Sequence, residues 1–169
     1  MARRGGFGKR KGSGFEREIC KILSLWVSNG HKEDVFWRSA MSGGRATFHH
    51  RKGTAIRQAG DICAVAPEGH EFSEAWFVEC KNIRDMRLSS FLLSDTGPLA
   101  KFWRVAQREA NIHGREPMLI VRSRGPIVVL TPSRPGRDKL SARPLLTAHA
   151  RGCQLIALTD LVAAPWRTI

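Results

Sequence analysis

The chain has 169 residues, enough for one domain with a hydrophobic core but too few for two typical domains. Its apolar fraction of 42% and charged fraction of 25% are those of a globular protein, and no apolar run approaches the roughly 20 residues of a membrane span, which argues against a membrane protein. The 28 Lys and Arg residues exceed the 15 Asp and Glu residues and give a net charge of +13, which indicates a polyanionic partner, nucleic acid first.

The four cysteines are far apart in the sequence and form no C-x-x-C pair: they are Cys20, Cys63, Cys80 and Cys153. Each lies among apolar residues, so we expect buried free thiols in a reducing, cytoplasmic compartment and no zinc site. The basic N-terminus has no apolar stretch after it, so we do not expect a secretory signal.

Residues 1–12 are rich in glycine and contain no acid, and their basic side chains are Arg3, Arg4, Lys9, Arg10 and Lys11. This composition predicts a flexible basic arm that contacts phosphates, with a solubilising tail as the alternative. Domain organisation is then an arm over 1–12 and a single domain over 13–169.

Ser13-Gly14-Phe15-Glu16 has the pattern of a capping box and predicts the start of a helix that ends at Asn29-Gly30. Apolar residues recur at helical spacing between these limits. Glu16 has two interpretations, because it can either cap the helix or project from the first turn into a site.

Residues 35–38 predict a short strand, and a long segment with no acid follows, from Ser39 to Ala59. A loop of this length within a small domain is often functional. The segment leads directly into Asp61, so we interpret it as a cationic segment near the DNA; its basic residues are Arg45, Arg51, Lys52 and Arg57.

Two apolar runs, over residues 60–66 and 76–82, carry Asp61, Glu79 and Lys81 at their polar ends. We expect two strands paired as a hairpin through a loop over 67–75. Glu79 and Lys81 are two apart and share one face of a strand, while Cys80 points the other way. Two carboxylates and an ammonium at one sheet edge suit metal-assisted phosphodiester hydrolysis. The alternative is an ordinary ion pair between Glu79 and Lys81, with Asp61 capping a turn.

The remaining chain predicts a polar connection, a helix, two strands, an irregular stretch, a last strand and a terminal helix that Thr159 caps. Their ranges are 82–98, 99–113, 117–122, 127–130, 132–152, 154–158 and 159–164. The whole order predicts an α/β fold in which helices flank a mixed sheet.

These motifs, in this order, resemble the PD-(D/E)XK nuclease superfamily, and within it the archaeal-type Holliday junction resolvases. The resemblance covers about Gly12 to Val121, and the matching residues are Gly14–Ile19, Arg38, Ser42–Gly44, Gly60–Ile62, Val78–Lys81 and the helix and strand over 99–122. It implies a restriction-endonuclease-like αβββαβ core. Gly60 stands where many members have proline, and the segment before Asp61 and the tail after Val121 are longer than in compact archaeal members.

The resemblance implies an endonuclease that uses Mg²⁺, with Mn²⁺ able to substitute, and that cuts branched DNA such as a four-way junction as a homodimer. Asp61, Glu79 and the Cys80 backbone carbonyl would hold the metal. Glu16 would act through a second ion or a water, and Lys81 would position the attacking water. The DNA-binding side chains would be Lys9, Arg10, Lys11, Arg17, Arg38, Ser42, Arg45, Arg51, Lys52 and Arg57.

Two alternatives remain. One is a nuclease of the same superfamily for another DNA, in flap, replication-linked or restriction-type cleavage. The other is a non-catalytic basic DNA-binding protein, whose binding would be sensitive to salt but indifferent to metal.

Overall fold

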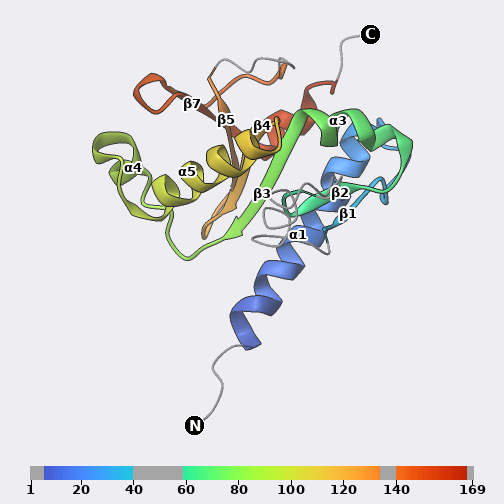
Figure 1. Ribbon diagram of the computed structural model, residues 1–169, viewed down its shortest axis with the longest axis horizontal. Coiled ribbons are helices and arrows are strands. Elements are labelled where there is room, and N and C mark those ends of the chain that lie inside the picture. The colour runs from blue at the N-terminus through green and yellow to red at the C-terminus, as the bar shows by residue number, and fades with distance from the viewer. Residues whose placement is uncertain (1–5, 40–58, 134–139, 167–169) are drawn as a thin grey trace.

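A mixed five-stranded sheet forms the centre of the protein, with helices on both of its faces (Figure 1). The computed structural model describes residues 6–39, 59–133 and 140–166. The strand order is β3-β4-β5-β7-β6, with bounds β3 (Trp76–Asn82), β4 (Glu116–Arg122), β5 (Ile127–Pro132), β7 (Cys153–Ala157) and β6 (Leu146–Ala148). Only β3 and β4 run parallel, and the other neighbours are antiparallel. This confirms the predicted mixed sheet.

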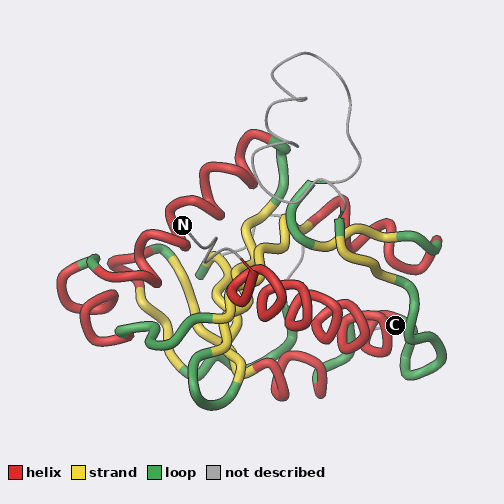
Figure 2. The backbone as a smooth tube through the Cα atoms, turned by 90° about the horizontal axis from the view of Figure 1, so that it is seen from below, coloured by secondary structure: helices red, strands yellow, loops and turns green. Residues whose placement is uncertain are grey.

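The helices divide between the two faces of this sheet, as Figure 2 shows. Their bounds are α1 (Gly6–Val27), α3 (His70–Ala75), α4 (Leu88–Ser94), α5 (Gly97–Ile112) and α6 (Leu158–Ala163). Side chains alternate along β4: Met118 and Ile120 join a core with α1, α3 and α6, whereas Leu119 and Val121 join a second core with α4 and α5. The sheet is therefore buried on both sides, as its continuous apolar strands predict.

The strand that follows Asp61 does not pair with β3, so the predicted hairpin is wrong. Instead β2 (Ile62–Ala64) pairs antiparallel with β1 (Phe36–Arg38) in a separate two-stranded sheet. The stretch between β2 and β3 is not an open loop, because it holds a 3₁₀ turn (Pro67–Gly69) and α3. Phe72 and Ala75 of α3 are buried, and this burial explains why a predicted loop is helical.

In chain order, α1-β1-β2-β3-α5-β4 is the αβββαβ core that the resemblance implies. Several boundaries differ from prediction. The first helix begins at Gly6, so Ser13 lies inside it and the predicted capping box is wrong. Residues 6–12 of the predicted arm belong to this helix, and residues 1–5 lie outside the described residues. Helix α6 begins at Leu158 with no side-chain cap, so Thr159 is not its N-cap.

The predicted polar connection after β3 contains a helix, α4, that buries Phe91. All four cysteines are free and buried. Among the helices of the described residues, none is long and apolar enough to cross a membrane.

Candidate active site

The candidate site lies at the outer edge of β3, where the two-stranded sheet meets the five-stranded one. The Asp61 amide donates to the Val78 carbonyl at 2.8 Å, and the Asp61 carboxylate accepts from the Cys80 amide at 2.8 Å. Asp61 thus occupies backbone groups that an edge strand would otherwise leave open. Gly60 makes this approach possible: its φ is +85°, and a Cβ there would lie 2.6 Å from the Val78 carbonyl oxygen.

Asp61, Glu79 and Lys81 come together at this edge. The Lys81 ammonium forms an ion pair with the Glu79 carboxylate and lies 3.9 Å from Oδ2 of Asp61. Glu79 and Lys81 share the face of β3 that α5 covers, because they pair in register with Leu119 and Val121 of β4. The structure therefore brings Asp61, Glu79 and Lys81 together, although the strands do not form a hairpin.

Burial makes this group of charges unusual. The Asp61 side chain is only 7% exposed and that of Glu79 only 13%. Desolvation, and then the nearby Glu79 carboxylate, raise the pKa of Asp61 to about 7, although Lys81 and the Cys80 amide act in the opposite direction. When both carboxylates are ionised, the single ammonium of Lys81 leaves a deficit of positive charge at this point.

Lys81 stays charged in this setting. Its burial alone would lower its pKa, but the Glu79 and Asp61 carboxylates outweigh that effect and the pKa is raised. The ring of Phe102, from α5, lies with its centroid 5.7 Å from the Lys81 ammonium. Cys80 points into the opposite core, where burial raises the pKa of its thiol well above the ordinary value, so the thiol is neutral.

Glu16 lies on α1 and forms an ion pair with Arg38 of β1. The negative charge of Glu16 contributes to the raised pKa of Asp61, so Glu16 lies close enough to interact electrostatically with that carboxylate. Glu18 instead pairs with Arg122 at 2.9 Å. The structure thus separates the two glutamates, as their angular separation on a helix predicts.

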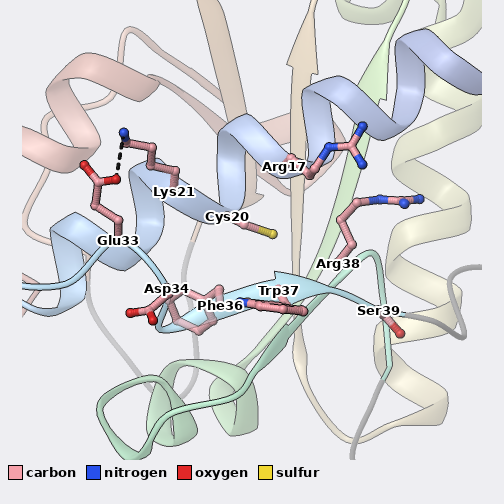
Figure 3. Close-up of a pocket in the computed structure, with 9 residues that line it drawn as sticks. All are labelled: Arg17, Cys20, Lys21, Glu33, Asp34, Phe36, Trp37, Arg38 and Ser39. Atoms are coloured by element: carbon pink, nitrogen blue, oxygen red, sulfur yellow. Dashed lines mark ion pairs between the residues drawn. The ribbon is translucent and has the colours of Figure 1, made fainter.

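A cavity of about 570 Å³ lies between α1 and β1, and Arg38, the ion-pair partner of Glu16, lines it (Figure 3). Arg17 and Arg38 extend from the two elements at the same end of the cavity, and the Lys21–Glu33 ion pair lies at the other end. The indole of Trp37 lines the cavity and is 63% exposed. The acids Glu33 and Asp34 also line the cavity, and the two arginines beside an exposed aromatic ring form the part of it that suits nucleic acid.

Other predicted DNA-binding residues are not placed by the structure. Ser42, Arg45, Arg51, Lys52 and Arg57 lie outside the described residues. Lys9, Arg10 and Lys11 belong to α1, a helix rather than an arm, and only their backbone is described.

Sequence reasoning missed three residues of this region. In the sequence, Gly60 is noted only because many family members have proline at this position. A glycine can nevertheless indicate a backbone position with positive φ. Phe102 lies within the helix predicted over 99–113, and its contact with Lys81 has no sequence signal. Trp37 was read as part of a strand, where its alternation with Phe36 could have indicated an outward ring.

The donor set of the site fits a hard divalent cation. No group of three or more His, Cys, Asp and Glu side chains in the described ranges is arranged to hold a metal. Two carboxylates, a backbone carbonyl and waters are nevertheless the ligands that Mg²⁺ takes in phosphoryl chemistry. Asp61 and Glu79 supply the two carboxylates, and the charge deficit around them is one that a cation would relieve.

An αβββαβ core with an acid directly before β2 and a Glu-x-Lys on the edge strand β3 defines the class of PD-(D/E)XK nucleases. A family model described as "Phage putative PDDEXK endonuclease" matches residues 8–151, and the chain belongs to this family. No curated protein and no solved structure matches the chain. The family confirms the predicted superfamily and the nuclease class.

Proposed function

We propose that this protein is a Mg²⁺-dependent endonuclease that cuts branched DNA, with a four-way junction as its preferred substrate. The observation that carries the proposal is the meeting of Asp61, Glu79 and Lys81 at the edge of β3. The phage endonuclease family supports hydrolysis of DNA, and the net charge of +13 supports a polyanionic substrate.

In this proposal Asp61, Glu79 and the Cys80 carbonyl hold the cation, which supplies Lewis-acid polarisation of the scissile phosphate. Lys81 donates hydrogen bonds to the attacking water and balances charge that develops on the phosphate. Its side chain is 28% exposed, so it can reach substrate from within the ion pair. Glu16 orients a water on the Arg38 side of the site.

Arg17 and Arg38 grip phosphates at the cavity between α1 and β1. Cutting a junction symmetrically requires two active sites, so we propose a homodimer as the active form. The four buried free thiols fit a reducing intracellular compartment.

The test is cleavage of a synthetic four-way junction and a linear duplex of matched sequence, each in Mg²⁺ and in EDTA. Glu79→Gln should abolish cutting and leave DNA binding intact, because it removes a charge with little change of shape. Glu68→Gln is the control, since Glu68 pairs with Lys32 at an exposed position and does not line the cavity between α1 and β1.

Each alternative gives a different result in this assay. Equal cutting of duplex and junction would replace the junction proposal with another PD-(D/E)XK task. Tight binding without cutting in any metal, indifferent to Glu79→Gln, would show a non-catalytic DNA-binding protein. Sedimentation of the protein with and without junction DNA tests the dimer.

A further inference from the structure

A second and larger cavity, of about 920 Å³, lies where the chain leaves β3. It is bounded by residues 83–88, by the start of α5 and by the turn after β4. Its volume lies in the range of sites that bind small ligands, about 300–1,000 Å³. Nothing in the proposed chemistry uses this cavity.

Three arginines line this cavity, Arg84, Arg87 and Arg124, with Asp85 as the acid among its lining residues. We call it the arginine-rimmed cavity. Arg87 and Arg124 have φ values of +49° and +48°, a left-handed conformation that is costly for residues other than glycine. Such strain is found preferentially at functional sites.

Hydrogen bonds fix the two loops that carry these arginines. The Ser123 hydroxyl donates to the Arg84 carbonyl at 3.2 Å, and the Ile83 amide donates to the Arg122 carbonyl at 3.0 Å. Arg84 and Arg124 are therefore held on neighbouring loops before any ligand arrives. The backbone from which these arginines extend is thus ordered before a ligand binds, which lowers the conformational cost of binding an anion.

The rest of the lining is apolar and includes Met86, Leu88 and Phe102, which are only partly buried. Phe102 also contacts the Lys81 ammonium, so this cavity adjoins the candidate active site. Binding of phosphate groups alone would require the arginine side chains but not the apolar lining. An apolar lining with an aromatic ring suits the faces of bases, which a duplex keeps stacked inside.

We propose that the arginine-rimmed cavity binds unpaired nucleotides of the DNA substrate next to the scissile phosphate, with bases on the apolar lining and phosphates on the arginines. This inference rests on the proposed nuclease function and adds that nucleotides unpair at the branch point of a bound junction, so that branched DNA with a single-stranded segment there is also a favoured substrate. A fully paired duplex cannot present its bases to this lining.

The test measures binding of the full-length protein by fluorescence anisotropy in EDTA, so that no cutting is required. The probes are a blunt duplex, the same duplex with a single-stranded tail, and the same tail without bases. The variants are Arg84→Gln/Arg124→Gln and Phe102→Leu. The matched control is Arg104→Gln/Arg108→Gln, which removes the same charge from two exposed positions of α5.

We expect the wild-type protein to prefer the tailed duplex over the blunt one by about ten-fold, the effect of one or two stacked bases. Removing the bases from the tail, or introducing Phe102→Leu or Arg84→Gln/Arg124→Gln, should reduce this preference to near one. The control should retain it. Similar affinity of all variants for the blunt duplex shows that they are folded.

Equal binding of tailed and blunt duplex by the wild-type protein would overturn the proposal. So would a preference that survives in the tail without bases, because phosphates alone would then explain it. The proposal would also be overturned if the control and Arg84→Gln/Arg124→Gln lost the preference for the tailed duplex equally, since the overall positive charge of the protein would then explain that preference. Failure to cut DNA in Mg²⁺ would refute the nuclease function without altering these binding ratios.

Discussion

Replacement of Asp61 by asparagine should stabilise the metal-free protein at alkaline pH while abolishing its activity. The asparagine side chain is not charged, so it avoids the cost of a buried anion next to Glu79. Its amide oxygen can still accept the hydrogen bond from the Cys80 backbone N–H. The substitution therefore removes charge and keeps the backbone contact at the edge of β3.

The size of the effect follows from the pKa of Asp61, which is about 7 in the folded protein against 3.8 for an ordinary carboxyl. This difference corresponds to about 4 kcal/mol of destabilisation when the carboxyl is ionised in both states. Because the folded pKa is the higher one, the folded state binds more protons between these values. Its stability falls as pH rises from about 4 to about 7 and is level above that. Local relaxation reduces the effect, so we expect Asp61→Asn to gain about 1–4 kcal/mol at pH 8.

The assay is chemical denaturation of wild-type protein and Asp61→Asn in EDTA at several pH values from 4 to 8. The gain should grow with pH and be small at pH 4, where the wild-type carboxyl is largely neutral in the folded state and only partly ionised in the unfolded one. Asp34→Asn, at an exposed position, should show no such trend. Mg²⁺ should stabilise the wild-type protein more than the variant, because it binds only the folded site. A variant that is less stable by the same amount at every pH would refute the reasoning.

Three further predictions concern neighbouring residues. Gly60→Ala should destabilise the protein by at least about 2 kcal/mol more than Gly30→Ala, as measured by thermal unfolding. Both glycines have a similar positive φ, but a Cβ at Gly60 alone would lie 2.6 Å from a backbone oxygen. Equal losses of stability would show that this close approach has no energetic cost. Lys81→Met should lower the free energy of unfolding by about 2 kcal/mol at pH 8 in EDTA, as measured by chemical denaturation. Adding Mg²⁺ should restore much of this loss, and a variant whose stability does not respond to Mg²⁺ would contradict a cation site there. Glu16→Gln should raise the Mg²⁺ concentration for half-maximal cutting about ten-fold and change the unfolding free energy by less than about 1 kcal/mol. Glu18→Gln, whose partner is Arg122, should leave the Mg²⁺ requirement unchanged, and equal effects of the two would place Glu16 outside the site.

The central sheet was predictable because its signals are local. Continuous apolar runs around 118–121 and 128–130 describe strands buried on both faces, and α5 shows a clear apolar face. The meeting of Glu79 with Lys81 follows from the two-residue period of a strand. These predictions depend on the residues of one element and not on which element lies beside it.

Strand partners were not predictable in the same way. Asp61 and Glu79 are 18 residues apart, and a hairpin is the simplest connection at that distance. The buried side chain of Phe72 makes the connecting segment a helix instead, so β2 lies beside β1 and Asp61 bonds to β3 from outside that strand pair. The start of α1 was also misplaced, because Ser13 and Glu16 have the pattern of a cap but the preceding residues continue the helix. Contacts such as that of Phe102 with Lys81 depend on the packing of α5 and have no local signature.

The position of the site on an edge strand explains how this fold tolerates it. On a central strand, buried carboxylates would project into the cores on the two faces of the sheet and displace apolar side chains. On the outer edge of β3, Asp61 replaces the missing strand, because its amide and carboxylate bond to Val78 and Cys80. The electrostatic cost is then confined to one border of the molecule, while both cores of the sheet stay apolar. The same border is open to substrate, with one cavity at α1 and β1 and the other at the end of β3. Arg38 of the first cavity pairs with Glu16, and Phe102 of the second contacts Lys81, so the edge position both confines the electrostatic cost and places the charged group beside two cavities.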